Sequence, residues 1–438
     1  MDLTLLGIIG ILVMIGLTFL GMNMGMSMFL VGLVGYWVAT GSWKQAIFLF
    51  RTVPFSNASS YTMVVIPLFV LMGAFALMSG MGKGLYDCCE RWLGRLPGGL
   101  SFATLVACGG FGAICGATNA TVLTMGRLAY PEMKRFKYDG GLSLATAAAG
   151  GTLSWLIPPS TGFILYGVIA TCSVGRLFAA GIIPGVILLV AYIVACTVLC
   201  IINPKLGPKG QNYTLKEKLK SLIGLIPIVV LFAAVIGGMF SGIFSATEAA
   251  AVGCLLAFLY TVCSGKFTWK GFTKALGDSV KSICMVFLIM LGAYVFGYFL
   301  TATHLPQDLA NLAANMNVNR YVIMLIIVVI YFLLGMVMDS MATVLLTVPI
   351  FLPVATSLGF DPIWFGVVIV LIMCAGSITP PICFGVFVSS TISSEVALKD
   401  VFKRVVPYCI AIFAVTVLII LFPSLSTWLP NLIYGPVL

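Results

Sequence analysis

The sequence predicts a polytopic, all-α membrane protein built as an inverted repeat, with two re-entrant helical hairpins and helices broken by proline and glycine. Of its 438 residues, 61% are hydrophobic and only 8% are charged. A water-soluble domain carries roughly 25% charged residues, so lipid must cover much of this surface. The apolar residues also gather in runs of the ~20 residues that a helix needs to span a bilayer.

The first apolar run covers residues 3–20. It lacks the basic start and the small-residue cleavage site of a signal peptide, so we expect it to remain as a first membrane segment. Lys44 and Arg51 follow it and suit an amphipathic helix at the membrane surface. Six later runs are predicted as plain crossings: residues 61–79, 182–202, 222–240, 246–263, 282–301 and 405–422.

Two other regions are interrupted in the middle and are predicted to be re-entrant hairpins, which return to the side from which they enter. Residues 102–130 are broken by glycines and then by Thr118-Asn119-Ala120-Thr121. Residues 321–358 are broken at Gly335, Asp339 and Ser340. Each half looks too short for a crossing, and irregular backbone is tolerated at membrane depth only inside protein or beside a cavity. The glycines of the first region are Gly109, Gly110, Gly112 and Gly116.

The distribution of Lys and Arg independently favours the hairpins. With residues 83–95 in the cytoplasm and the two hairpins entering from opposite sides, nearly all of the 23 basic residues fall in cytoplasmic loops. The exceptions are Lys44, Arg51, Arg176 and Arg320. Membrane proteins concentrate Lys and Arg in this way, which also explains the net charge of +10 without a nucleic-acid partner.

The two interrupted regions resemble each other. Ala120-Thr121-Val122-Leu123 recurs as Ala342-Thr343-Val344-Leu345, and Pro158-Pro159 recurs as Pro380-Pro381, both at an offset of 222 residues. Because the halves enter the membrane from opposite sides, the chain reads as an inverted repeat. Secondary transporters share this plan, and their substrate site lies near the midplane between the halves.

Hairpin tips and Pro-Pro breaks leave backbone groups unpaired in a region of low dielectric, where a bound ion or anion can satisfy them. Neutral hydroxyl, amide and carbonyl oxygens suit sodium, and the N-termini of half-helices suit a carboxylate. The predicted sodium ligands are Gly116, Thr118, Asn119, Thr121, Gly151, Thr152, Gly335, Ser340, Thr343, Gly376, Ser377 and Thr379. The predicted substrate-binding residues are Thr121, Pro158, Pro159, Ser160, Thr379, Pro380 and Pro381.

Simpler interpretations stay open for each of these residues. Gly, Ser and Thr in membrane helices often serve only to let helices pack closely. Glu248 opens a predicted helix, where an acid is favoured by the helix dipole whether or not it has a function. Asp339 has no acidic counterpart at the matching Ala117, which favours a supporting or gating role over a ligand. Since these are the main acids within the spans, sodium is favoured over a proton as coupling ion.

Several motifs together resemble the large membrane subunit of the tripartite ATP-independent periplasmic (TRAP) transporters, and the similarity runs over nearly the whole chain. They include Ile66-Pro67-Leu68-Phe69-Val70-Leu71-Met72-Gly73, Leu96-Pro97-Gly98-Gly99-Leu100, Gly116-Ala117-Thr118-Asn119-Ala120-Thr121, Ala179-Ala180-Gly181-Ile182-Ile183-Pro184-Gly185, Thr247-Glu248-Ala249-Ala250-Ala251-Val252-Gly253 and Thr379-Pro380-Pro381. Unlike many members, residues 74–78 carry no acid.

The resemblance implies a sodium-driven elevator transporter in the bacterial inner membrane, and not an enzyme. Its expected partners are a separate small membrane subunit and a periplasmic binding protein that delivers a carboxylate, such as a dicarboxylate, keto acid or sugar acid. The transport domain would comprise residues 99–202 and 319–430, each with one hairpin. Residues 1–98 and 203–302 would form the scaffold, with a cytoplasmic loop at the start of the second segment.

Other classes remain as alternatives. A stand-alone sodium- or proton-coupled dicarboxylate symporter would share the inverted repeat but need no partner chain. A proton-translocating respiratory subunit would show a line of Lys, Glu and His within its spans, and this chain lacks one. An intramembrane enzyme would need a catalytic set, and the sequence does not place Ser, Asp and His together. A channel would have little use for paired hairpins.

Overall fold

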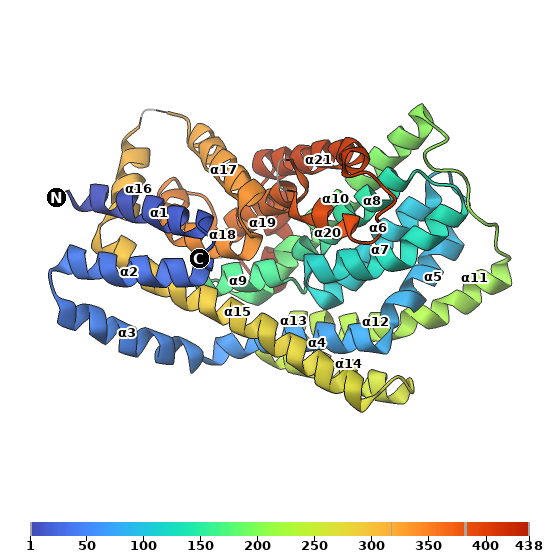
Figure 1. Ribbon diagram of the computed structural model, residues 1–438, viewed down its shortest axis with the longest axis horizontal. Helices are drawn as coiled ribbons and strands as arrows, with labels where there is room; N and C mark the ends of the chain where they lie inside the picture. The colour runs from blue at the N-terminus through green and yellow to red at the C-terminus, as the bar shows by residue number, and fades with distance from the viewer. Residues whose placement is uncertain (1, 317, 381–382, 437–438) are drawn as a thin grey trace.

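The computed structural model describes residues 2–316, 318–380 and 383–436, and these residues form helices without a single strand (Figure 1). Nine helical segments in this part of the chain are long and apolar enough to cross a membrane. Each of the six predicted plain crossings corresponds to one of them. The prediction of a polytopic all-α protein is therefore confirmed.

The helices follow one another as α1 (Leu3–Phe19), α2 (Met24–Thr40), α3 (Trp43–Ala58), η1 (Tyr61–Val64), α4 (Val65–Ser79), α5 (Met81–Leu93), α6 (Gly99–Cys115), α7 (Thr118–Arg135), α8 (Gly140–Leu156), α9 (Thr161–Ile169), α10 (Val174–Ile202), α11 (Leu215–Ser221), η2 (Leu222–Leu225), α12 (Ile226–Phe232), η3 (Ala233–Gly237), α13 (Gly238–Phe240), α14 (Ala246–Cys263), α15 (Trp269–Ala302), α16 (Leu305–Asn315), α17 (Arg320–Val337), α18 (Ser340–Ser357), α19 (Pro362–Ile378), α20 (Phe384–Ser390), α21 (Leu398–Leu421) and α22 (Ser424–Tyr434).

The helix boundaries extend the repeat beyond the two hairpins. Helices α7 and α18 begin and end 222 residues apart, as do α8 and α19, and α2 and α14 begin at the same offset. Asp139 and Asp361, the N-cap residues of α8 and α19, occupy matching positions and accept hydrogen bonds from their first turns. The repeat thus covers most of the chain, including the segments outside the hairpins.

The two halves meet where a residue of one half contacts the equivalent residue of the other half. Cys374 Sγ on α19 donates a hydrogen bond of 3.4 Å to the carbonyl oxygen of Thr152 on α8, and these residues lie 222 positions apart. A residue that contacts its equivalent must lie near the axis that relates the halves. The crossing of α8 and α19 therefore marks the centre of the repeat.

Two sets of helices pack around this arrangement. Helix α2 packs along α15, and helix α14 packs along α4. The two pairs are equivalent in the repeat, because α2 corresponds to α14 and α4 corresponds to the second part of α15. The first pair approaches very closely, since a Cβ atom on Gly292 would lie 2.1 Å from the Gly25 carbonyl oxygen. Helices α6, α7 and α8 and helices α17, α19 and α21 form the second set, with α8 packed against both α19 and α21.

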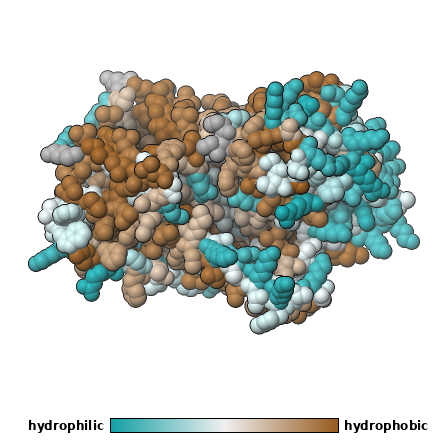
Figure 2. Space-filling view, in the orientation of Figure 1, coloured by the Kyte–Doolittle hydropathy of each residue, from teal (hydrophilic) through white to brown (hydrophobic). Residues whose placement is uncertain are grey.

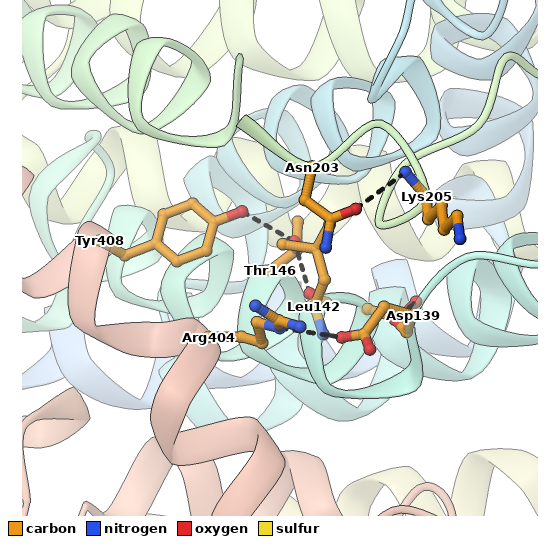
Figure 3. Close-up of polar contacts among 8 residues, drawn as sticks. Asp139, Leu142, Thr146, Asn203, Lys205, Arg404 and Tyr408 are labelled. Atoms are coloured by element: carbon orange, nitrogen blue, oxygen red, sulfur yellow. Dashed lines mark hydrogen bonds and ion pairs between the residues drawn. The ribbon is translucent and has the colours of Figure 1, made fainter. Parts of the chain in front are cut away.

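Side-chain bonds hold α21 of the second half against α8 of the first (Figure 3). Arg404 Nε lies 3.2 Å from Asp139 Oδ1, and the same oxygen accepts the Leu142 N–H that it caps at 2.8 Å. Two turns away, the hydroxyls of Thr146 and Tyr408 lie 2.9 Å apart in a buried position. The two repeats of this helix set are therefore joined by polar as well as apolar contacts.

Hydrophilic side chains gather at one end of the long axis, over α5 and α11, whereas the other half of the visible face is mostly apolar (Figure 2). That end carries the loop of residues 203–214 between α10 and α11. Helix α5 and the segment from residue 203 to the end of α11 both belong to the regions that the positive-inside pattern places in the cytoplasm.

Three details of the sequence interpretation need correction. Gly109, Gly110 and Gly112 lie inside α6, and Gly335 lies inside α17, so none of them breaks a helix. Helices α17 and α18 have 18 residues each and are apolar enough to cross a membrane, so the argument that both halves of the second hairpin are too short is wrong. The hairpin interpretation depends on charge distribution instead.

Glu248 has a structural role at the start of α14. Its Oε2 accepts the Ser245 N–H at 2.7 Å, while Ser245 Oγ accepts the Glu248 N–H at 3.3 Å. This reciprocal pair is a capping box, which satisfies two N–H groups that a helix start leaves unpaired. The simpler of the two interpretations of Glu248 is therefore sufficient.

Candidate functional site

The tip of the first hairpin lies between α6 and α7. Helix α6 ends at Gly116, which adopts a left-handed conformation with φ 63°, and α7 begins after an extended Ala117. Thr161 Oγ1, at the start of α9, donates a hydrogen bond of 2.6 Å to the Gly116 carbonyl. The hairpin tip is thereby tied to the segment that follows the first Pro-Pro pair.

The first Pro-Pro break separates α8 from α9. Pro158 and Pro159 have no N–H groups to leave unpaired, and Ser160 caps α9 by accepting the Phe163 N–H at 3.4 Å. The Ser160 hydroxyl also donates to the Trp155 carbonyl at the end of α8. All three predicted substrate-binding residues at this break are buried, and none of them lines the cavities described below.

The tip of the second hairpin has a different chemistry. Asp339 caps α18, and its Oδ2 accepts the N–H groups of Met341 at 3.0 Å and Ala342 at 3.4 Å. Thr343 Oγ1 donates to the Asp339 carbonyl at 3.0 Å. The equivalent position at the first tip is Ala117, which offers no side-chain cap to α7.

The second Pro-Pro break follows α19. Thr379 Oγ1 donates to the Ala375 carbonyl at 2.7 Å, and Ser377 Oγ donates to the Cys374 carbonyl at 2.8 Å. Pro380 is exposed and Pro381 lies outside the described residues. Thr379 Oγ1 also lies 3.5 Å from Cys409 Sγ, so both hydroxyls have partners within the protein.

A small cavity of about 80 Å³ brings the two hairpin tips together. It is lined by Ala117, Thr118, Asn119, Trp155, Gly335, Met338, Asp339, Ser340, Met341, Ser377, Phe384 and Gly385. Five of the predicted sodium ligands are among these residues: Thr118, Asn119, Gly335, Ser340 and Ser377. The other predicted ligands do not line this cavity: Gly116, Thr121, Gly151, Thr152, Thr343, Gly376 and Thr379.

Several of those residues set the packing of the hairpin helices. A Cβ atom on Gly151 would lie 2.2 Å from the side chain of Val122 in the second turn of α7, and one on Gly376 would lie 2.8 Å from the Gly335 carbonyl carbon. Glycine is needed at these two positions because the hairpin helices cross α8 and α19 there without space for a side chain. Close packing therefore explains glycine at both positions, and their role as sodium ligands stays a prediction.

The oxygens at the tips suit a sodium ion. In the described part of the chain, the side chains of Thr118, Asn119 and Ser340 form no hydrogen bond within the protein. Thr121 Oγ1 is fully buried and also has no partner. A buried hydroxyl without a partner is unfavourable, so this orphaned oxygen behind the first tip fits a site that a hard cation completes.

A larger cavity of about 550 Å³ separates the hairpin tips from α4 and α15. Asn119, Asp339 and Met341 face it from the tips, while Asp278, Ser279 and Ser282 face it from α15. Its volume falls within the ~300–1,000 Å³ of typical small-molecule sites. The sequence interpretation missed the residues of α15, because nothing in that helix alone shows which face meets the tips.

Asp339 also borders a third cavity of about 220 Å³, beside Thr18 and Asn23 at the turn between α1 and α2. It thus lines all three cavities around the tips. No group of three or more His, Cys, Asp and Glu in the described residues could hold a metal ion. A cation at this site would therefore depend mainly on neutral oxygens.

Comparison with known proteins gives one family match. The family described as "Tripartite ATP-independent periplasmic transporter, DctM component" matches residues 11–425. The sialic acid TRAP transporter large permease protein SiaM of Vibrio cholerae is 32% identical over 427 residues, covering 96% of this chain and 97% of its own length. The C4-dicarboxylate TRAP transporter large permease protein DctM of Pseudomonas aeruginosa is 31% identical, covering 86% of this chain and 88% of its own length.

The isethionate TRAP transporter permease protein DctMQ of Oleidesulfovibrio alaskensis is 30% identical over 85% of this chain, and the match covers 59% of that longer protein. Among solved structures, the YdaH transporter of Alcanivorax borkumensis aligns with a TM-score of 0.65 at 15% identity, covering 87% of this chain and 89% of YdaH. At 15% sequence identity, this structural similarity supports the fold alone.

Proposed function

Because the chain belongs to the DctM component family of the tripartite ATP-independent periplasmic transporters, we propose that it imports small organic anions on the sodium gradient. It is a multi-pass protein of the bacterial inner membrane and a large permease subunit, not an enzyme. The relatives described above are named for sialic acid, C4-dicarboxylates and isethionate, so an acidic solute is the shared theme.

The observation that carries the proposal is the meeting of the two hairpin tips. The uncapped start of α7 offers unpaired N–H groups, and the hydroxyls and amide of Thr118, Asn119 and Ser340 offer free oxygens in the same small cavity. The first feature suits a carboxylate, and the second suits sodium. Coupling follows if both are bound by the same pair of tips, because each ligand then stabilises the arrangement that the other needs.

We propose an elevator mechanism in which α6–α10 and α17–α21 move together against a scaffold that includes α2, α4, α14 and α15. The large cavity supports this division, since the tips share it with α4 and α15. Leu77 lies near the end of α4 that precedes Lys83, and Asp278 lies between Lys274 and Lys281. The cavity thus reaches the end of α4 that the charge pattern places in the cytoplasm, and it extends along that helix to Ile66 near the opposite end.

Two further chains complete the proposed importer. A small membrane subunit would pack against the scaffold, and a periplasmic binding protein would deliver the anion. The longer DctMQ relative supports the first of these, because a large part of it lies outside the region that this chain matches.

Uptake into liposomes tests the proposal. The chain would be reconstituted with its small subunit, and uptake of succinate, pyruvate and gluconate would be measured with and without an inward sodium gradient and with and without the external binding protein. We expect uptake that needs both. Sodium-driven uptake without the binding protein would instead indicate a stand-alone symporter, and uptake driven by a proton gradient alone would refute sodium coupling.

A variant pair connects that result to the site. Asn119→Ala removes a free amide from the cavity between the tips and should abolish most uptake. Asn212→Ala makes the same change at an exposed residue of the loop before α11 and should leave uptake unchanged. Equal uptake by the two variants would show that the anion and sodium bind elsewhere.

A further inference from the structure

The two hairpin tips are chemically unequal although the repeat places them in matching positions. Both N–H groups that Asp339 binds belong to the first turn of α18, so a resident carboxylate already occupies that helix terminus. The first turn of α7 has no side-chain cap, because Ala117 stands at the equivalent position. Only one of the two termini is open to a carboxylate of the cargo.

The large cavity beside the tips is acidic. Asp278 of α15 and Asp339 of α18 both line it, and no Lys, Arg or His is among the lining residues in the described part of the chain. Lys274 and Lys281 lie one turn before and after Asp278 on the same helix, but neither is within ion-pair distance of it. A second carboxylate on the cargo would face these acids without a basic partner.

Free acceptors and an orphaned hydroxyl line the same space. Both hydrogen bonds of the Asp339 side chain use Oδ2, which leaves Oδ1 able to accept another donor. Ser279 also lines the cavity, only 3% exposed, and its Oγ has no hydrogen-bond partner in the structure. Buried polar atoms are rarely left unpaired, so this hydroxyl, although covered by its neighbours, is a polar group beside the cavity without a protein partner among the described residues.

We propose that the cargo carries one carboxylate and, at its other end, a hydrogen-bond donor such as an ammonium or hydroxyl group in place of a second carboxylate. The carboxylate binds at the open N-terminus of α7, and the donor faces Asp339 Oδ1 with Asp278 and Ser279 across the cavity. This inference rests on the proposed function and changes its substrate class from organic anions in general to compounds with a single carboxylate, which are either hydroxylated monocarboxylate anions or zwitterions.

Three probes of equal length separate the classes: succinate, 4-hydroxybutyrate and 4-aminobutyrate differ only in the group opposite their shared carboxylate. Their binding to the chain with its small subunit in nanodiscs, in sodium buffer and without the binding protein, would be measured by calorimetry. We expect 4-aminobutyrate and 4-hydroxybutyrate to bind at least about tenfold more tightly than succinate, because like charges at close range repel in a partly desolvated cavity.

Variants at the matching tip positions assign the preference to named residues. Asp339→Asn removes the charge but keeps a good N-cap, so it should fold and should improve succinate binding about tenfold relative to 4-aminobutyrate. Asp278→Asn, at an exposed side chain with no hydrogen bond to lose, should shift the order in the same direction by a smaller factor. Ala117→Asp places a carboxylate at the open terminus of α7 and should weaken all three probes.

The outcomes separate the inference from the proposed function. Succinate binding as tight as that of 4-aminobutyrate, or an order unchanged in Asp339→Asn, would overturn the inference while leaving the importer intact. If Asp339→Asn altered only the sodium concentration needed for binding and left the order of the three probes unchanged, Asp339 would be assigned to the coupling ion, and the inference would again be overturned. Binding of none of the three probes at any sodium concentration would overturn the carboxylate site itself, and the inference with it.

Discussion

The hydrogen bond from Thr161 to Gly116 connects the first hairpin tip to the segment after the Pro-Pro break, and its removal offers a direct test of the site. Thr161→Val replaces the hydroxyl by a methyl group of similar size. A net hydrogen bond contributes about 1 kcal/mol, and a buried carbonyl left without a partner costs about 1–3 kcal/mol. Since Gly116 is buried and Thr161 is only 8% exposed, we expect a loss of about 1.4 kcal/mol or more, within that range.

That loss should appear in sodium binding, because the Gly116 carbonyl and the free oxygens of Thr118 and Asn119 belong to one tip. If the tip must recover its geometry when sodium binds, a penalty of about 1.4 kcal/mol weakens the apparent sodium affinity about tenfold. The assay titrates sodium while following carboxylate binding to the purified complex. Thr161→Ser keeps the hydroxyl and should behave as wild type. Sodium affinity in the valine variant equal to that of the serine variant would refute this account of the tip.

Three other changes have expected effects on stability. Burial raises the pKa of the Glu90 carboxyl, although the hydrogen bond that the Tyr213 hydroxyl donates to it lowers the pKa in part. The charged form of Glu90 therefore opposes folding above the folded-state pKa. In thermal unfolding, Glu90→Gln should stabilise the protein at pH 8 and lose that advantage toward pH 4. Asp139→Ala removes the cap of α8 and the Arg404 ion pair and should lower the free energy of unfolding by about 1–2 kcal/mol, whereas Asp139→Asn should lose less. Gly376→Val forces α19 from α17 and should destabilise by about 1–3 kcal/mol or prevent expression.

Matched controls exist for each of these changes. Glu395→Gln alters an exposed acid and should show no gain at pH 8. Asp400→Asn changes an acid at the start of α21 that lies outside the Asp139 ion pair, and it should be nearly neutral in the same unfolding assay. Gly277→Val lies in α15 with open space where its Cβ would be, so a loss as large as that of Gly376→Val would contradict the packing explanation.

The positions of the two hairpin breaks could be predicted from the sequence because each break combines glycine or an acid with a cluster of polar residues inside an apolar run. The structure breaks the two hairpins at Gly116–Ala117 and Met338–Asp339, next to the predicted Thr118 and Ser340. The repeat offset was also readable, since identical short motifs recur at one spacing.

The meaning of the other glycines could not be read from the chain alone. Gly112 and Gly335 look like breaks in sequence, yet they lie where helices cross, against Ser154 and Gly376. Glycine suits both a close crossing of two helices and a break in one helix. The two cases can be distinguished only when the position of the partner helix, which is distant in sequence, is known. Ser279 was missed for a related reason, because the face that α15 turns toward the tips depends on the packing of helices far away in sequence.

The central claim is that the paired tips travel past the scaffold to carry the anion across the membrane, and a distance measurement tests it most directly. Spin labels would be placed at Cys263, exposed at the end of α14, and at Thr356→Cys, exposed at the end of α18, with the other cysteines replaced. We predict two distance populations whose ratio changes when sodium and a transported carboxylate are added together. A single, unchanged distance under conditions that support uptake would contradict the moving-tip account.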